Sequence, residues 1–232
     1  MAYTVTMFLL LMFYALVTYC MKYMRSTKIV NICFAAAVFL PYIFHSLYIY
    51  SQVGFDDWNF QNTLPVANVS PFMFTSMLFL LFLPKKLRKY VFLLISLLSV
   101  GMLASMMVNC VSNALIHYKF HPHFLLDYIA HVNLSLFGVY LVRSGQVELT
   151  KKACTVSGGM IYSVAFTMLI LNLIFDTSFF GLSLRGKHSI YNAVVSNESI
   201  VSVLVYFVGV FVVLFLGYLY GKLLQKFTKP ID

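Results

Sequence analysis

The sequence predicts an all-α fold: a polytopic membrane helix bundle of seven transmembrane helices, with the N-terminus outside and the C-terminus in the cytoplasm. Three observations support this prediction. The 232-residue chain is 61% apolar and only 10% charged, too few charges to cover a soluble domain of this length. Its apolar residues form runs long enough to cross a bilayer. Its basic residues gather in alternate loops, as in multi-pass membrane proteins.

A helix needs about 20 apolar residues to cross the hydrocarbon core of a bilayer. Seven segments meet this length: Tyr3 to Tyr23, Ile29 to Tyr50, Leu64 to Leu83, Tyr90 to Leu115, Phe124 to Val142, Ala153 to Phe175 and Ile200 to Leu223. The first has no basic residues before it, so we expect a retained, reverse-oriented helix rather than a cleaved signal peptide. Residues 1–232 are therefore predicted to form a single integral membrane domain, multi-pass in the cell membrane.

The lysines and arginines predict the orientation of these spans. Thirteen of the sixteen lie in or beside the loops after the first, third and fifth spans or in the C-terminal tail. The other three are Lys119, Arg185 and Lys187. The positive-inside rule assigns the basic face to the cytoplasm, which places the N-terminus outside. Basic loops beside an anionic leaflet also account for the net charge of +9, so membrane lipids are the expected partners and nucleic acid is not.

The four cysteines, Cys20, Cys33, Cys110 and Cys154, lie in or beside apolar runs. They show no CxxC spacing, which argues against a disulfide framework or a thiolate metal site. A seven-helix metal hydrolase is disfavoured because the last span carries no HxxxH pair. The sequence thus predicts no metal and no cofactor, and it does not predict an oligomeric state.

The stretch "HYKFHPHFLLDYIAH", residues 117 to 131, holds four of the six histidines and is expected on the outer side. Asp127 and His131 stand four residues apart, so on a helix they share one face. Such a carboxylate can orient the imidazole and support it as a general base. The alternative is a structural pair that holds its helix to its neighbours. His123 and His45 are candidates for ligand binding, although a solvated surface position is the simpler interpretation for His123.

A second polar group opens the third predicted span, in "NTLPVANVSPF". Pro65 fits the first turn of a helix, and Pro71 is able to kink it. Asn68 and Ser70 place polar side chains where a wholly apolar span is expected. Ser70 is a candidate nucleophile and Asn68 a candidate ligand-binding residue, and the alternative for both is hydrogen bonding between helices.

Three segments together resemble the YwaF-like bacterial integral membrane proteins, which are related to a eukaryotic group of transmembrane acyltransferases. They are "FHSLYIYSQVGFDDWNFQNTLPVANVS", "FHPHFLLDYIAHVNLSLFGVYLV" and "LNLIFDTSFFGLS". The family pattern of Leu-Pro at the start of helix three matches Leu64 and Pro65, and its Pro-His-Phe stretch matches Pro122 to Phe124, with His131 following. The resemblance covers roughly residues 40 to 220 and implies a multi-pass helix bundle.

The chain departs from this family at one position that bears on chemistry. Family members commonly carry a cysteine a few residues after Leu-Pro, and a Cys and a His are thought to form the transfer centre of the acyltransferase branch. Val69 stands at the matching position here, and valine is not a nucleophile. The resemblance therefore implies fold and topology more than it implies acyl transfer.

Two hypotheses for function follow. In the first, the chain is a membrane-embedded lipid acyltransferase or hydrolase with an outward-facing polar cavity, in which Asp127 orients His131 as the base and Ser70 acts as nucleophile. In the second, it is not an enzyme and binds or moves a lipophilic small molecule through Asn68, His45 and His123. A receptor role is compatible with the topology alone, but the loops are short and carry no signalling motif.

Overall fold

The structure is a computed structural model that describes residues 2–21, 24, 28–53, 69–80, 82–117, 120–175 and 200–226. The long elements in these ranges are all helices: α1 (Ala2–Cys20), α2 (Lys28–Val53), α4 (Val69–Leu80), α5 (Lys85–Ile116), α6 (His123–Arg143), α7 (Lys151–Phe175) and α8 (Ile200–Lys226). Six of these described helices, all except α4, are long and apolar enough to cross a membrane. The predictions of an all-helical fold and of a multi-pass membrane protein are confirmed at this level.

The third predicted span differs most from the structure. Its described helix, α4, has 12 residues, and at about 1.5 Å per residue this is much shorter than a hydrocarbon core of about 30 Å. Residues 64–68 of the prediction lie outside the described residues. The predicted end at Leu83 is wrong, because α4 ends at Leu80 and Leu83 lies in the connection before Pro84.

Helix α5 begins at Lys85, five residues before the predicted start at Tyr90. Pro84 precedes the helix with φ −52° and ψ 145°, an extended conformation that ends one segment and leads into the next. Its carbonyl accepts a hydrogen bond from the Arg88 amide at 2.9 Å, so the basic cluster forms the first turn of the helix. The predicted span leaves out this turn because the span was placed by its apolar residues. Lysine is charged but has a high helix propensity, so the helix extends beyond the apolar run.

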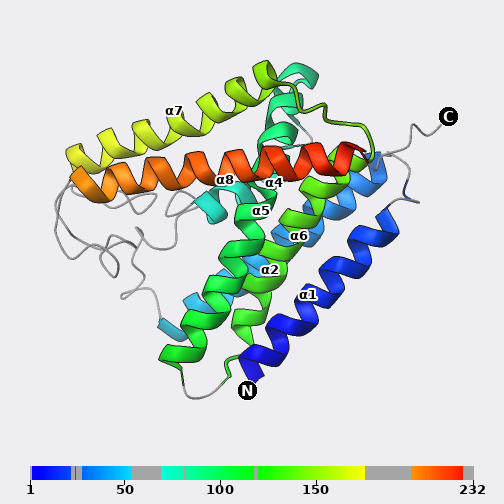
Figure 1. The fold of residues 1–232 in the computed structure, drawn as a ribbon. Helices are drawn as coiled ribbons and strands as arrows, with labels where there is room; N and C mark the ends of the chain where they lie inside the picture. The colour runs from blue at the N-terminus through cyan, green and yellow to red at the C-terminus, as the bar shows by residue number, and fades with distance from the viewer. Residues whose placement is uncertain are drawn as a thin grey trace.

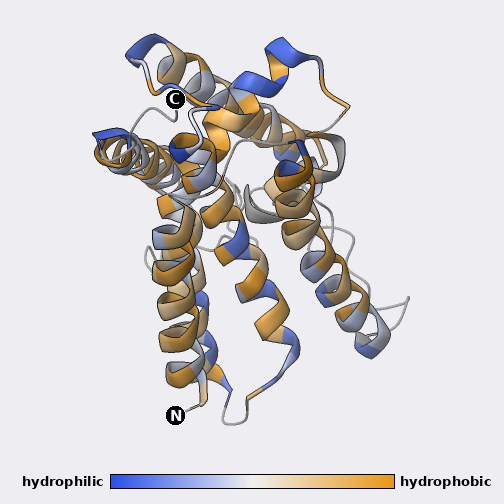
Figure 2. Ribbon diagram, turned by 90° about the vertical axis from the view of Figure 1, so that its right-hand side faces the viewer, coloured by the Kyte–Doolittle hydropathy of each residue, from blue (hydrophilic) through white to orange (hydrophobic). Residues whose placement is uncertain are grey.

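An antiparallel hairpin of α5 and α6 forms the centre of the molecule, with α2 and α1 packed along α6 (Figure 1). Hydrophobic residues run along the helices, and hydrophilic residues lie mainly at helix ends or on isolated turns (Figure 2). The described part of α6 is the most deeply buried span, whereas α1, α2, α7 and α8 present many large apolar side chains outward. Such faces are suited to contact with lipid.

Helices α7 and α8 run side by side in opposite directions, steeply inclined to the α5–α6 hairpin (Figure 1). Transmembrane helices tilt by about 20° on average from the bilayer normal. Helices that cross this steeply do not all stand upright in one bilayer. The inclination therefore makes the path of α7 and α8 the part of the topology that most needs a direct measurement.

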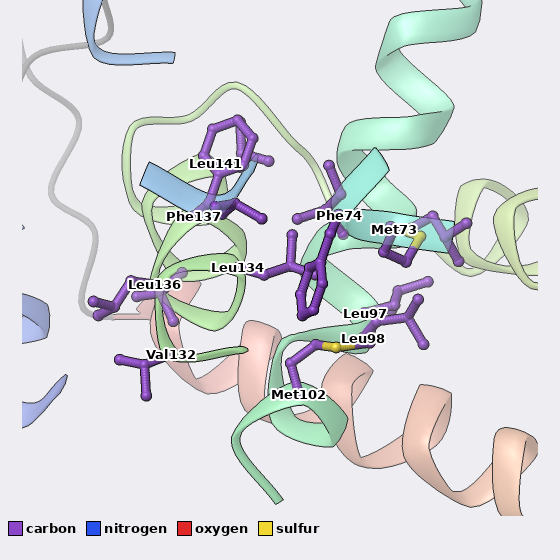
Figure 3. Packing of buried hydrophobic residues seen from close by; sticks show 14 of the residues in the cluster. Met73, Phe74, Leu97, Leu98, Met102, Val132, Leu134, Leu136, Phe137 and Leu141 are labelled. Atoms are coloured by element: carbon purple, nitrogen blue, oxygen red, sulfur yellow. The ribbon is translucent and has the colours of Figure 1, made fainter. Parts of the chain in front are cut away.

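The core of the bundle lies where α4, α5 and α6 meet. Figure 3 shows its buried side chains, among them Phe74 from α4, Leu97 and Met102 from α5, and Leu134 and Phe137 from α6. Two glycines bring backbones close to α5, Gly138 from α6 and Gly217 from α8. A Cβ on Gly138 would stand 2.8 Å from the Ile95 carbonyl oxygen, and a Cβ on Gly217 would overlap the Leu97 carbonyl group. Close approach of backbones at small residues is how helices commonly associate in membranes.

Hydrogen bonds between helices supplement this packing. Pro41 lies inside α2 and has no N–H to donate to the carbonyl of Ala37, four residues earlier. Asn133 of α6 donates its side-chain amide to that carbonyl at 2.7 Å. A partly buried carbonyl that lacks its helical donor is thus satisfied from the neighbouring helix, as lipid-embedded backbones require.

At the other end of α6, Arg143 donates to the carbonyl of Thr18 on α1 at 2.7 Å. The side chains of Asn31 on α2 and Gln146 exchange two hydrogen bonds, at 2.8 and 3.1 Å. These bonds join the end of α1, the start of α2 and the end of α6. Three segments predicted to lie on the cytoplasmic side are therefore at one end of the molecule, while the end of α5 and the start of α6 lie at the opposite end (Figure 1).

Candidate functional site

His131 is buried between α5 and α6, with only 3% of its surface exposed. One edge of its ring meets Phe74 of α4 in a T-shaped contact, with 4.9 Å between ring centroids. Its Nδ1 lies 2.9 Å from the carbonyl oxygen of Asp127 and 3.4 Å from the carboxylate Oδ1 of the same residue. The predicted pairing of Asp127 with His131 is therefore present, and the backbone makes the closer of the two contacts.

The carbonyl contact determines which nitrogen carries the proton in a neutral His131 ring. A carbonyl oxygen only accepts hydrogen bonds, so Nδ1 must be the donor. Nε2 is then unprotonated and able to accept a proton. The hydroxyl of Ser105 on α5 faces this nitrogen, with its Oγ 3.3 Å from Nε2. The arrangement has the order of a nucleophile, a base and an orienting group.

Ser105 belongs to a polar row on α5 that sequence reasoning did not single out. Ser105, Asn109 and Asn113 are spaced four residues apart and so lie on one face of the helix. Asn109 donates to the Oδ2 of Asp127 at 3.2 Å, and Asn113 donates to the Tyr128 hydroxyl at 2.7 Å. The four-residue polar spacing in an apolar span was the sequence signal for this row.

A second group of side chains surrounds Phe124 at the start of α6. Four histidine rings lie within 6.5 Å of the Phe124 ring, centroid to centroid: His45, His117, His121 and His123. His45 donates from Nδ1 to the carbonyl of His123 at 2.9 Å, and the two rings stack at 5.6 Å. The Nδ1 of His123 is buried without a hydrogen-bond partner. The predicted ligand-binding residues His45 and His123 are thus in contact with each other.

The two groups adjoin along α6, because His123, Asp127 and His131 follow each other at one-turn intervals. Ser70 lies in the first turn of α4, but its side chain is outside the described residues. Asn68 and His188 also lie outside the described residues. The predictions for Ser70 and Asn68 therefore stay predictions.

Within the described residues, no group of three or more His, Cys, Asp or Glu side chains is arranged to hold a metal ion. The four cysteines are free thiols. The rings around Phe124 pack against one another and against aromatic neighbours: His123 stacks on Tyr48, with 4.7 Å between ring centroids, and is tilted against His121 and Phe124.

The fold and the site together define an all-helical multi-pass membrane protein in which a buried His131 lies beside a partly buried Ser105 and Asp127, between two central helices. Comparison of the chain with protein-family models, with curated proteins and with solved structures found no match. The resemblance to the YwaF-like proteins consequently stays a prediction from sequence.

Proposed function

We propose that the protein is a membrane-embedded hydrolase or acyltransferase that acts on a lipid ester, with Ser105 as nucleophile, His131 as base and Asp127 as the residue that orients the imidazole. The contact of Ser105 Oγ with His131 Nε2 at 3.3 Å carries this proposal. It keeps the roles that the sequence predicted for His131 and Asp127. Ser105 replaces Ser70 because its hydroxyl is the one described beside the base.

The chemistry follows the usual course of acyl transfer. Ser105 Oγ attacks the ester carbonyl carbon while its proton passes to His131 Nε2. The carbon–oxygen bond of the ester breaks, and the same proton passes to the departing alkoxide. Water or an acceptor alcohol then releases the acyl group from Ser105 by the reverse sequence of proton transfers.

Hydrolysis of a fluorogenic long-chain ester by the purified protein in detergent tests this proposal. His131→Ala should lower the rate by about 10²- to 10⁴-fold, the usual contribution of a positioned base, and Ser105→Ala should lower it at least as much because it removes the nucleophile. Ser99→Ala is a matched control, because among the described residues its hydroxyl bonds to the Ser96 carbonyl of the same helix, at 2.8 Å, and not to His131. Full activity of Ser105→Ala with loss of activity in Ser70→Ala would reject Ser105 and return the role to Ser70.

Binding of a lipophilic molecule without catalysis is the second candidate. One observation favours it: an apolar groove of about 550 Å³ lies between α5, α7 and α8, and His131 is not among its lining residues. If the purified protein cleaves no ester and wild type and Ser105→Ala bind a long-chain ester equally well, this second function replaces the first.

We further propose that the chain crosses the membrane seven times with the N-terminus outside. The alternation of basic loops supports this topology, and the steep inclination of α7 and α8 argues against it. In a cysteine-free background, His121→Cys and Arg185→Cys should react with a membrane-impermeant maleimide in intact cells, and Lys86→Cys should not. Protection of Arg185→Cys alone would show that α7 does not cross; labelling of Lys86→Cys would reverse the orientation.

A further inference from the structure

The groove between α7 and α8 is built from one face of each helix. On α7 its lining residues follow helical spacing from Lys151 through Cys154, Gly158 and Gly159 to Tyr162. On α8 it is lined by Phe211, Leu214, Phe215 and Tyr218. Leu97 of α5 lies at its base. The groove is thus continuous along about three helical turns.

Two glycines keep the groove open. A Cβ on Gly159 would meet nothing within 4 Å, and one on Gly158 would only reach the Leu214 side chain, at 3.6 Å. Side chains at these two positions would fill the space between the helices. The adjacent Gly–Gly pair is otherwise unfavourable in the middle of a helix, by about 1 kcal/mol per residue relative to alanine.

The two ends of the groove differ in chemistry. At one end Tyr162 stacks on Phe207, with ring centroids 5.6 Å apart, and donates its hydroxyl to the Phe207 carbonyl at 2.9 Å, which closes that end. At the other end Lys151 lines the groove, and the Lys222 ammonium lies 5.9 Å from the ring centroid of Tyr218, another lining residue. Two positive charges therefore flank the polar end of an apolar channel.

The dimensions suit one acyl chain. From Lys151 to Tyr162 the groove follows α7 for about 16 Å at 1.5 Å per residue, which is about half of a hydrocarbon core of about 30 Å and so close to the length that the acyl chains of one leaflet fill. The volume of about 550 Å³ falls within the usual range of ligand sites, about 300 to 1,000 Å³. Basic pockets between membrane helices are suited to phosphate head groups.

We propose that this groove binds an anionic phospholipid, with one acyl chain between α7 and α8 and the phosphate between Lys151 and Lys222. The second acyl chain stays in the bilayer. Ser105 and His131 are not among the residues that line this groove, so the proposal does not depend on the proposed catalysis.

Photocrosslinking in nanodiscs tests the proposal. The full-length protein is placed in phosphatidylcholine nanodiscs that contain a small fraction of phosphatidylglycerol with a diazirine at the end of one acyl chain. After irradiation, crosslinked peptides are mapped by mass spectrometry. Crosslinks should concentrate on α7 and α8 around Gly159 and Phe211. A phosphatidylcholine probe with the same diazirine chain should give several-fold fewer crosslinks there.

Two pairs of variants separate the groove from general contact with lipid. Gly159→Leu fills the groove and should abolish these crosslinks, whereas Gly209→Leu should not, because a Cβ there also meets nothing within 4 Å but Gly209 is not a lining residue. Lys151→Gln should lower the yield of anionic-lipid crosslinks about five-fold, which corresponds to about 1 kcal/mol for a lysine near an anionic head group. Lys152→Gln, at an exposed position outside the lining, is its control.

Equal crosslinking in Gly159→Leu and Gly209→Leu would overturn the proposal. So would a phosphatidylcholine probe that labels α7 and α8 as strongly as phosphatidylglycerol, because the charge at the groove entrance would then have no role. Should Gly159→Leu fail to yield monodisperse protein, the two lysine variants decide the outcome on their own.

Discussion

The hydrogen bond from Asn133 to the carbonyl of Ala37 allows a sharp test of the packing of α2 against α6. Because Pro41 donates no N–H, this carbonyl depends on Asn133 at 2.7 Å for its partner. Asn133→Leu keeps the side-chain volume and leaves the carbonyl unsatisfied. An unsatisfied buried group lowers the free energy of unfolding by about 1 to 3 kcal/mol.

The same substitution should matter far less once Pro41 is replaced. In Pro41→Ala the new N–H at position 41 is able to donate to the Ala37 carbonyl through the helix itself. In this background Asn133→Leu should lower the free energy of unfolding by no more than about 0.6 kcal/mol, the average for one hydrogen bond between membrane helices. With a loss of about 2 kcal/mol beside Pro41, the middle of the range above, the double-mutant cycle is expected to give a coupling free energy of about 1.4 kcal/mol between Pro41 and Asn133.

Reversible unfolding in mixed detergent micelles gives the free energy of unfolding for all four proteins of the cycle. The stability that Pro41→Ala itself adds cancels in the coupling term, because it enters both sides of the cycle. A coupling within about 0.5 kcal/mol of zero, the range of independent sites, would refute the assignment of Asn133 as the replacement donor.

Two further predictions concern the contact between α5 and α6 and the Asp127–His131 pair within α6. Gly138→Ala places a Cβ 2.8 Å from the Ile95 carbonyl oxygen, so the helices must separate by several tenths of an ångström. Gly209→Ala is the control, because it has the same gain in helix propensity but open space around the new Cβ. We expect the free energy of unfolding of Gly138→Ala to be about 1 to 3 kcal/mol lower than that of Gly209→Ala. Equal stability of the two variants in the same detergent titration would argue against the close approach. His131→Ala should also lower the free energy of unfolding by about 1 to 3 kcal/mol, since it removes the imidazole from the Asp127 carboxylate and leaves Asn109 as the described donor to that group. Asp127→Asn keeps the shape and should lose less; the reverse order would contradict the pairing.

The burial of His131 changes how its variants report on function. A cavity-facing imidazole would contribute little packing, so a stable and inactive His131→Ala protein would have indicated catalysis. With 3% of its surface exposed and Phe74 against its ring, His131 contributes to stability whatever its function. Ser105→Ala removes a single oxygen atom and is therefore the cleaner test of the proposed chemistry.

Much of the helix content was readable from the sequence because apolar runs of about 20 residues have few alternatives to a membrane helix. The boundaries of five of the six long helices agree with prediction to within three residues. The sixth, α5, starts earlier because its basic first turn is helical without being apolar. The inclination of α7 and α8 depends on contacts with α5, which no local pattern encodes.

Only the part of the candidate site that lies on one helix could be predicted from the sequence. Asp127 and His131 lie on one helix, so their spacing alone predicts their contact. Ser105 is on another helix, and its place opposite His131 depends on the register of the α5–α6 hairpin. Pro41 was equally visible as a helix-breaking residue, but its compensation by Asn133 depends on the packing of α2 against α6.

The most direct measurement for the proposed chemistry is the site of covalent modification by a long-chain fluorophosphonate, which reacts with a serine activated by a neighbouring base. The purified protein is labelled in detergent and its peptides are mapped by mass spectrometry. The account predicts one modified residue, Ser105, with labelling lost in His131→Ala. Modification of Ser70 instead, or labelling of Ser105 that persists in His131→Ala, would contradict it.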